Sequence, residues 1–105
     1  RLFDLAYAAR HWVPFRATAG LDPALQGIDQ VERFARFADV HRLTRAERGR
    51  VVDIAGLLLD RLLEVIHDRA DAGIGGFGAM WSAGYAEGNR ADRTWLDDHT
   101  ERLIS

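Results

Sequence analysis

Residues 73–78, Gly-Ile-Gly-Gly-Phe-Gly, have the spacing G-x-G-x-x-G, which in other proteins holds the phosphates of a nucleotide. Phosphate-binding loops of this kind follow a β-strand or join two strands. A long helical pattern precedes the segment here. We therefore interpret residues 73–78 as a turn between two helices rather than as a nucleotide site.

No other group of residues forms a recognisable catalytic or metal site. The four histidines fall in four different predicted helices, and no H-E-x-x-H or H-x-H pair occurs. The absence of cysteine excludes disulfides, thiolate zinc sites and cysteine nucleophiles. No serine stands in a G-x-S-x-G setting, and no pair of catalytic carboxylates can be identified. The residues alone predict a helical domain without an active site of its own.

Acidic and aromatic side chains supply the remaining candidates for a binding site. Asp97, Asp98 and Glu101 form an acidic patch on the last predicted helix, which is typical of a solvated face. The alternative is a docking surface for a cationic ligand, since ammonium groups pair with carboxylates. Trp12 and Trp81 are candidates to line a ligand cleft, whereas most aromatic residues pack in a core.

Helical periodicity runs through the whole chain, and alternating strand patterns are absent. Asp29 and Thr44 precede helical patterns as N-caps, and Gly73 is the expected C-terminal cap of the longest helix. Gly88-Asn89 is expected to break the following helical pattern into two. The sequence therefore predicts an all-α bundle of about five helices in one unit over residues 1–105, with helices at residues 3–13, 30–41, 45–72, 77–87 and 91–104.

Composition narrows the class of protein further. Fourteen arginines stand against sixteen acidic residues without any lysine, so the formal net charge is −2 and no basic surplus favours nucleic acid. No apolar run is long enough for a membrane span, and no signal-peptide pattern begins the chain. We expect a cytoplasmic protein with the arginine-rich style of a GC-rich bacterial genome. The abrupt apolar start suggests an interior part of a longer protein.

Several short segments resemble the aminoglycoside phosphotransferase family, which also includes choline-kinase-like enzymes. Residues 2–14 contain Asp4-Leu5-Ala6 followed by a His-Trp-Val-Pro sequence, similar to the D-[LI]-A region of that family. Residues 77–84 resemble its late Phe…Met-Trp…Gly helix, and residues 91–96 its closing acid…Trp-Leu helix. The order and spacing of these segments extend the resemblance over nearly the whole chain.

The resemblance implies a protein-kinase-like fold that uses ATP and Mg²⁺ to phosphorylate a small-molecule hydroxyl. The family's H-G-D-x-x-x-x-N and D-x-D motifs do not occur here, so the catalytic loop and N-terminal lobe would belong to a longer parent protein. Only Asp4 carries over, as a brace for the catalytic loop. A simple helix N-terminal acid is the alternative.

Two functions follow from these observations. The first is the substrate-side helical subdomain of such a kinase, with the missing lobe and a small-molecule hydroxyl substrate as partners. It predicts an exposed apolar face around Leu2, Leu5, Ala9 and Trp12. The second is a non-enzymatic helical interaction or dimerisation module, for which a homodimer stays open and no orphan apolar face is expected. A family member that regulates a partner without catalysis is a third alternative.

Overall fold

The computed structural model describes all 105 residues. It contains five α-helices, two short 3-10 helices and no β-strand, which confirms the predicted all-α bundle. The elements in chain order are α1 (Leu2–Trp12), η1 (Thr18–Gly20), η2 (Pro23–Leu25), α2 (Gln30–Val40), α3 (Arg45–Asp71), α4 (Phe77–Ser82) and α5 (Tyr85–Ile104).

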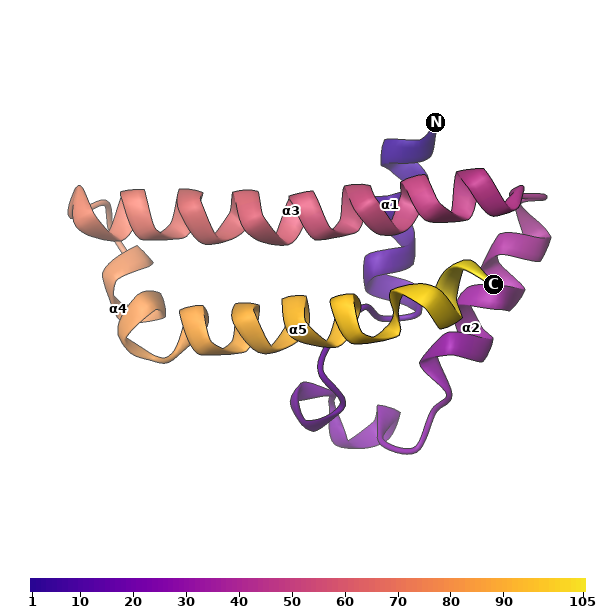
Figure 1. Cartoon of the computed structure of the whole chain (residues 1–105). Helices are drawn as coiled ribbons and strands as arrows, with labels where there is room; N and C mark the ends of the chain where they lie inside the picture. The colour runs from indigo at the N-terminus through magenta and orange to yellow at the C-terminus, as the bar shows by residue number, and fades with distance from the viewer.

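Helices α3 and α5 lie side by side in opposite directions and form the long axis of the molecule (Figure 1). The short helix α4 connects them at one end, and α2 packs against α5 at the other end. Helix α1 crosses α3 near the end that carries α2. Helix α3 is the central helix of the bundle, because α1, α4 and α5 all pack on it.

The hydrophobic core is concentrated where α1, α2, α3 and α5 meet. Phe15, Phe34, Leu96, Val13 and Val51 are its largest fully buried side chains. The rings of Phe15 and Phe34 pack edge to face with centroids 5.2 Å apart. Toward α4 the burial becomes thin, since α4 itself contains no buried residue. The end of the molecule that carries α4 therefore has little apolar packing to hold it.

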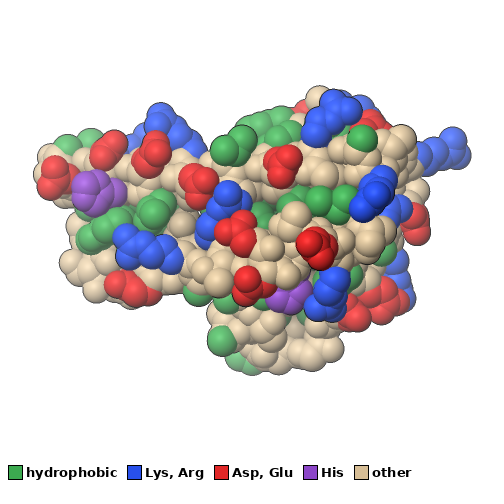
Figure 2. Space-filling model, in the orientation of Figure 1, with side chains coloured by type: hydrophobic (Ala, Val, Ile, Leu, Met, Phe, Trp, Pro, Cys, Tyr) green, Lys and Arg blue, Asp and Glu red, His purple; other side chains and the backbone are tan.

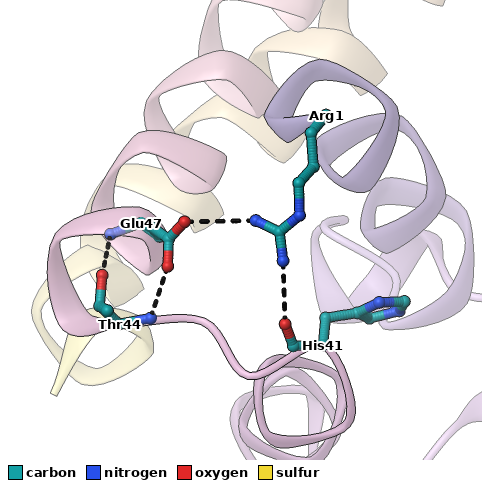
Figure 3. A network of polar contacts seen from close by, with 4 residues as sticks. All are labelled: Arg1, His41, Thr44 and Glu47. Atoms are coloured by element: carbon teal, nitrogen blue, oxygen red, sulfur yellow. Dashed lines mark hydrogen bonds and ion pairs between the residues drawn. The ribbon is translucent and has the colours of Figure 1, made fainter.

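Side-chain caps define the starts of α2 and α3 as the sequence predicts. The Asp29 carboxylate accepts a hydrogen bond from the Glu32 backbone N–H at 3.0 Å. Thr44 and Glu47 form a complete capping box at the start of α3 (Figure 3). Arg1 extends this network, because its guanidinium donates to Glu47 at 3.2 Å and to the His41 carbonyl at 3.0 Å. The network thus joins the beginnings of α1 and α3 to the end of α2.

Backbone hydrogen bonds end α3 in a Schellman motif. The N–H of Ile74 donates to Arg69 O at 3.0 Å, and the N–H of Gly73 donates to Ala70 O at 3.1 Å. Gly73 has φ +71°, a conformation that favours glycine. The predicted role of Gly73 as C-terminal cap is confirmed, and residues 73–78 join two helices as expected.

The predicted break at Gly88-Asn89 is wrong. Helix α4 ends at Ser82, and α5 begins at Tyr85 and continues through both residues to Ile104. The break lies at Gly84 instead, where φ is +100°. Asn89 is held inside α5 because its side-chain Nδ2 donates to the Leu59 carbonyl of α3 at 3.0 Å. A contact between distant helices therefore decides which glycine ends the helix.

Candidate functional site

Asp4 lies on the outward face of α1, in the first turn. Its carboxylate is exposed and makes no side-chain hydrogen bond or ion pair within the chain. Phe3 and Tyr7 stand beside it and are 55% and 53% exposed. An acid without a partner thus lies within an aromatic helix face. The role of Asp4 as a brace stays a prediction.

The composition of this exposed face differs from the prediction. Ala9 is fully buried, and Leu2 and Leu5 pack against the core. Only Trp12 of the four predicted residues is exposed. Helix α1 turns its small and aliphatic residues toward α3, because small side chains permit close helix crossing, and it leaves the aromatic residues outside.

Trp12 is 47% exposed and packs at the end of α1 against α2. The Arg33 guanidinium lies 4.5 Å from the centroid of its ring and donates to the Trp12 carbonyl at 2.6 Å. Trp12, Phe37 and Val40 line a mostly apolar hollow of about 320 Å³. The structure thus gives Trp12 a hollow with apolar walls and few polar groups.

Trp81 lies at the opposite end of the molecule, on α4. Its ring packs edge to face on His67 of α3 with centroids 5.0 Å apart. Two shallow hollows border it, and neither includes Trp12. The two tryptophans proposed as cleft candidates therefore do not meet in one site.

The acidic residues of α5 are interleaved with arginines over the face shown in Figure 2. Asp97 pairs with Arg93 at 3.6 Å, and Arg93 also reaches Asp60 of α3 at 3.3 Å. Asp98 is exposed and makes no ion pair, although Arg102 lies four residues further along the same helix. Asp97 and Asp98 belong to a mixed-charge surface rather than to a concave acidic site.

The largest polar cleft lies elsewhere, between the end of α1, the turn from α4 into α5, and the first half of α5. Its volume is about 510 Å³, within the range of small-molecule sites. Basic residues from the end of α1 and the following loop, polar residues of α5 and several apolar residues line it: Arg10, His11, Arg16, Leu59, Met80, Ala83, Gly84, Tyr85, Gly88, Asn89 and Asp92.

Asp92 is the acidic group of this cleft. Its Oδ1 accepts a hydrogen bond from the Ala17 backbone N–H at 2.9 Å, and its Oδ2 lies 3.8 Å from Arg16 Nε. Burial raises the pKa of this carboxyl, while the Ala17 N–H and the charges of Arg16 and Arg10 act in the opposite direction. The loop after α1 is therefore tied to α5 by a carboxylate that has lost much of its water.

Asn89 lies one helical turn before Asp92 and is only 5% exposed. Its amide nitrogen donates to Leu59 O, whereas its amide oxygen accepts no hydrogen bond from the chain. Sequence reasoning missed Asn89, Asp92, Arg10 and Arg16 as a group. The spacing of Asn89 and Asp92 on one helix face would have been informative only if the helix had been predicted to continue through Gly88.

No helix is long and apolar enough to cross a membrane, and no three His, Asp or Glu side chains gather closely enough to hold a metal ion.

No family model, curated protein or solved structure matches the chain.

Proposed function

We propose that this chain is the substrate-side helical part of an ATP-dependent phosphotransferase that acts on a small-molecule hydroxyl. The resemblance of three separated segments to the aminoglycoside phosphotransferase family supports the proposal. The all-α architecture is compatible with the helical part of such an enzyme. The observation that carries the proposal is the position of Asp4.

Asp4 is the acid of the D-[LI]-A segment, and it lies exposed and without a partner on α1. The aromatic residues Phe3 and Tyr7 flank it, so the face combines apolar area with one acceptor of hydrogen bonds. A neighbouring catalytic part that packs on this face would bury both aromatic rings. Its loop N–H groups would satisfy the carboxylate, because buried carboxylates require hydrogen-bond donors. Asp4 would then act as a positioning residue for that loop.

ATP and Mg²⁺ are assigned to the rest of the parent protein in this proposal. The residues present here do not fit either group, because the glycine-rich segment 73–78 joins two helices and no cluster of carboxylates is formed. The contribution of this chain is to shape and position the acceptor. No chemical step is assigned to its side chains.

The test uses the complete reading frame that encodes residues 1–105. We expect H-G-D-x-x-x-x-N and D-x-D motifs before Asp4, and ATP-dependent phosphorylation of at least one compound in a panel of hydroxylated acceptors. In that protein, Asp4→Asn should lower kcat about tenfold to a hundredfold and leave KM for the acceptor nearly unchanged. Asp53→Asn is the matched control, because Asp53 is exposed on α3 and makes no ion pair.

Lack of turnover on every acceptor despite intact upstream motifs would refute the proposed phosphotransferase activity. Equal kinetic effects of Asp4→Asn and Asp53→Asn would overturn the role of Asp4.

The alternative is a non-enzymatic helical interaction or dimerisation module. The closed surface that the sequence led us to expect for this alternative is not found, since the hollow beside Trp12 is apolar and Val40 at its rim is 77% exposed. Only the dimerisation form of the alternative agrees with that hollow. A second copy of this chain is the occupant it predicts. Sedimentation of the chain across a concentration series would then reveal a dimer that Val40→Glu abolishes. A monomer at every concentration would exclude dimerisation.

A further inference from the structure

We propose that the cleft between α1 and α5 binds a small hydroxylated oxyanion, in which a phosphate or carboxylate stands next to a hydroxyl group. The proposal concerns binding by this chain itself. It is independent of phosphoryl transfer and of the assignment of Asp4.

Two arginines that line the cleft have unused hydrogen-bond donors. Arg10 at the end of α1 and Arg16 in the following loop both line the cleft, and neither guanidinium donates a hydrogen bond to another group of the chain. The only carboxylate near them is Asp92, which lies 3.8 Å from Arg16. The planar fork of arginine matches the oxygens of phosphate and carboxylate. An oxyanion would supply the acceptors that these two side chains lack.

Two residues of α5 that line the cleft have acceptors without a donor from the chain. Asn89 is almost fully buried, and its amide oxygen accepts no hydrogen bond, while its nitrogen is held by Leu59 O. Asp92 Oδ1 is occupied by the Ala17 N–H, but Oδ2 has no donor within hydrogen-bond distance. Both residues lie on one face of α5, one turn apart. A ligand hydroxyl would donate to this pair in place of water, because neither oxygen has a donor from the chain.

The charged groups that line the cleft determine whether it favours an anion or a cation. Two guanidinium groups face one carboxylate. The surplus favours an anion over a polycation such as an amino sugar. The cleft of about 510 Å³ restricts the ligand to a small molecule.

The experiment is titration calorimetry of the purified chain with glycerol 3-phosphate, glycerate, inorganic phosphate, glycerol and spermidine. We expect glycerol 3-phosphate or glycerate to bind more tightly than inorganic phosphate, and glycerol and spermidine to bind weakly or not at all. The two hydroxylated anions distinguish a phosphate ligand from a carboxylate ligand. Failure of both to bind up to about 10 mM would overturn the proposal.

Two variants separate a built site from general attraction of anions. Arg10→Gln with Arg16→Gln should weaken binding at least about tenfold, because both charged donors are lost. The control replaces Arg45 and Arg50 by Gln, since these exposed arginines make no ion pair and the change in net charge is the same. Equal weakening by the two pairs would show attraction by net charge alone and would overturn the site.

Asp92→Asn is a further test, in which anion binding should become stronger rather than weaker. Asparagine retains an oxygen for the Ala17 N–H and removes the negative charge that faces the anion. We therefore expect tighter binding of inorganic phosphate in this variant, by roughly threefold to tenfold. Glycerol 3-phosphate should gain less, because the asparagine nitrogen cannot accept from the ligand hydroxyl. Weaker anion binding together with loss of spermidine binding would instead identify a cation site and refute the proposal. Circular dichroism of each variant verifies that the helices remain folded.

Discussion

Replacing Gly56 by Ala tests the contact that sets α3 against α5. Gly56 is buried on α3, and a Cβ at this position would overlap Nη1 of Arg93 and lie 2.7 Å from its Cζ. Arg93 lies across the glycine and forms ion pairs with Asp60 at 3.3 Å and with Asp97 at 3.6 Å. An alanine would therefore displace the guanidinium from both carboxylates.

Two opposing effects determine the change in stability. Glycine to alanine in a helix interior raises the free energy of unfolding by about 1 kcal/mol. The ion pairs are partly exposed, with side-chain exposures of 34% for Arg93, 50% for Asp60 and 62% for Asp97, so each contributes only about 0.2–1 kcal/mol. We expect Gly56→Ala alone to change the free energy of unfolding by less than about 1 kcal/mol in either direction.

A double-mutant cycle separates the two effects. In an Arg93→Ala background no guanidinium is displaced, and Gly56→Ala should stabilise by about 1 kcal/mol. The coupling energy should be on the order of 1 kcal/mol, measured by urea denaturation followed by circular dichroism.

Gly49→Ala is the control, because a Cβ at Gly49 meets Ile104 Cδ1 only at an ordinary 3.7 Å. This control substitution should give the same stability change in both backgrounds. A coupling energy of zero for Gly56→Ala would refute the inferred contact between Arg93 and Gly56.

Three further predictions follow from the charges and the packing. Backbone and side-chain hydrogen bonds from Thr44 lower the pKa of Glu47 below its ordinary 4.5. The folded state therefore gains stability from the ionised carboxylate above pH 4.5, and loses it as the pH falls through the lower folded pKa. Urea denaturation from pH 3 to 6 should show a weaker acid dependence for Glu47→Gln, and an unchanged slope would contradict this.

The pKa of Asp92 shifts in the opposite direction to that of Glu47, because burial raises it above the ordinary 3.8. Its contribution is greatest below pH 3.8 and declines as the pH rises through the folded pKa, so Asp92→Asn should gain stability relative to wild type over that interval. A constant difference between the two proteins would oppose the assignment. Hydrogen exchange should be fastest in α4, which has no buried residue, and protection there equal to that of α2 would be inconsistent with the thin packing.

The starts of α2 and α3 could be predicted from sequence because their causes are local. Asp29 and Thr44 cap helices through N–H groups three residues away, and the same short spacing is visible in the sequence. The Schellman motif at Gly73 is equally local, since its hydrogen bonds span only a few residues. Such interactions depend little on the remainder of the fold.

The break between α4 and α5 required tertiary information. Gly84 and Gly88 are both compatible with a helix end, and glycine adopts positive φ at little cost. The choice depends on Asn89, which reaches the Leu59 carbonyl across to α3 and keeps its own segment helical. No pattern within residues 84–89 contains that partner.

The outward face of α1 also required tertiary information. The kinase-subdomain hypothesis predicted an exposed apolar face that included Ala9, yet the fold buries Ala9 and exposes Tyr7. Periodicity identifies an amphipathic helix, but the packing of α1 on α3 selects which of two apolar sides faces inward.

The amino-acid sequence by itself determined the all-α class, the helix caps and the absence of a recognisable catalytic motif, because propensity and capping act between near neighbours. Only the tertiary structure decided the polar cleft. Arg10 and Arg16 meet Asn89 and Asp92 across more than seventy residues of chain, through the hydrogen bond from Ala17 to Asp92. Those residues become neighbours because the crossing of α1 over α3 brings the end of α1 to α5.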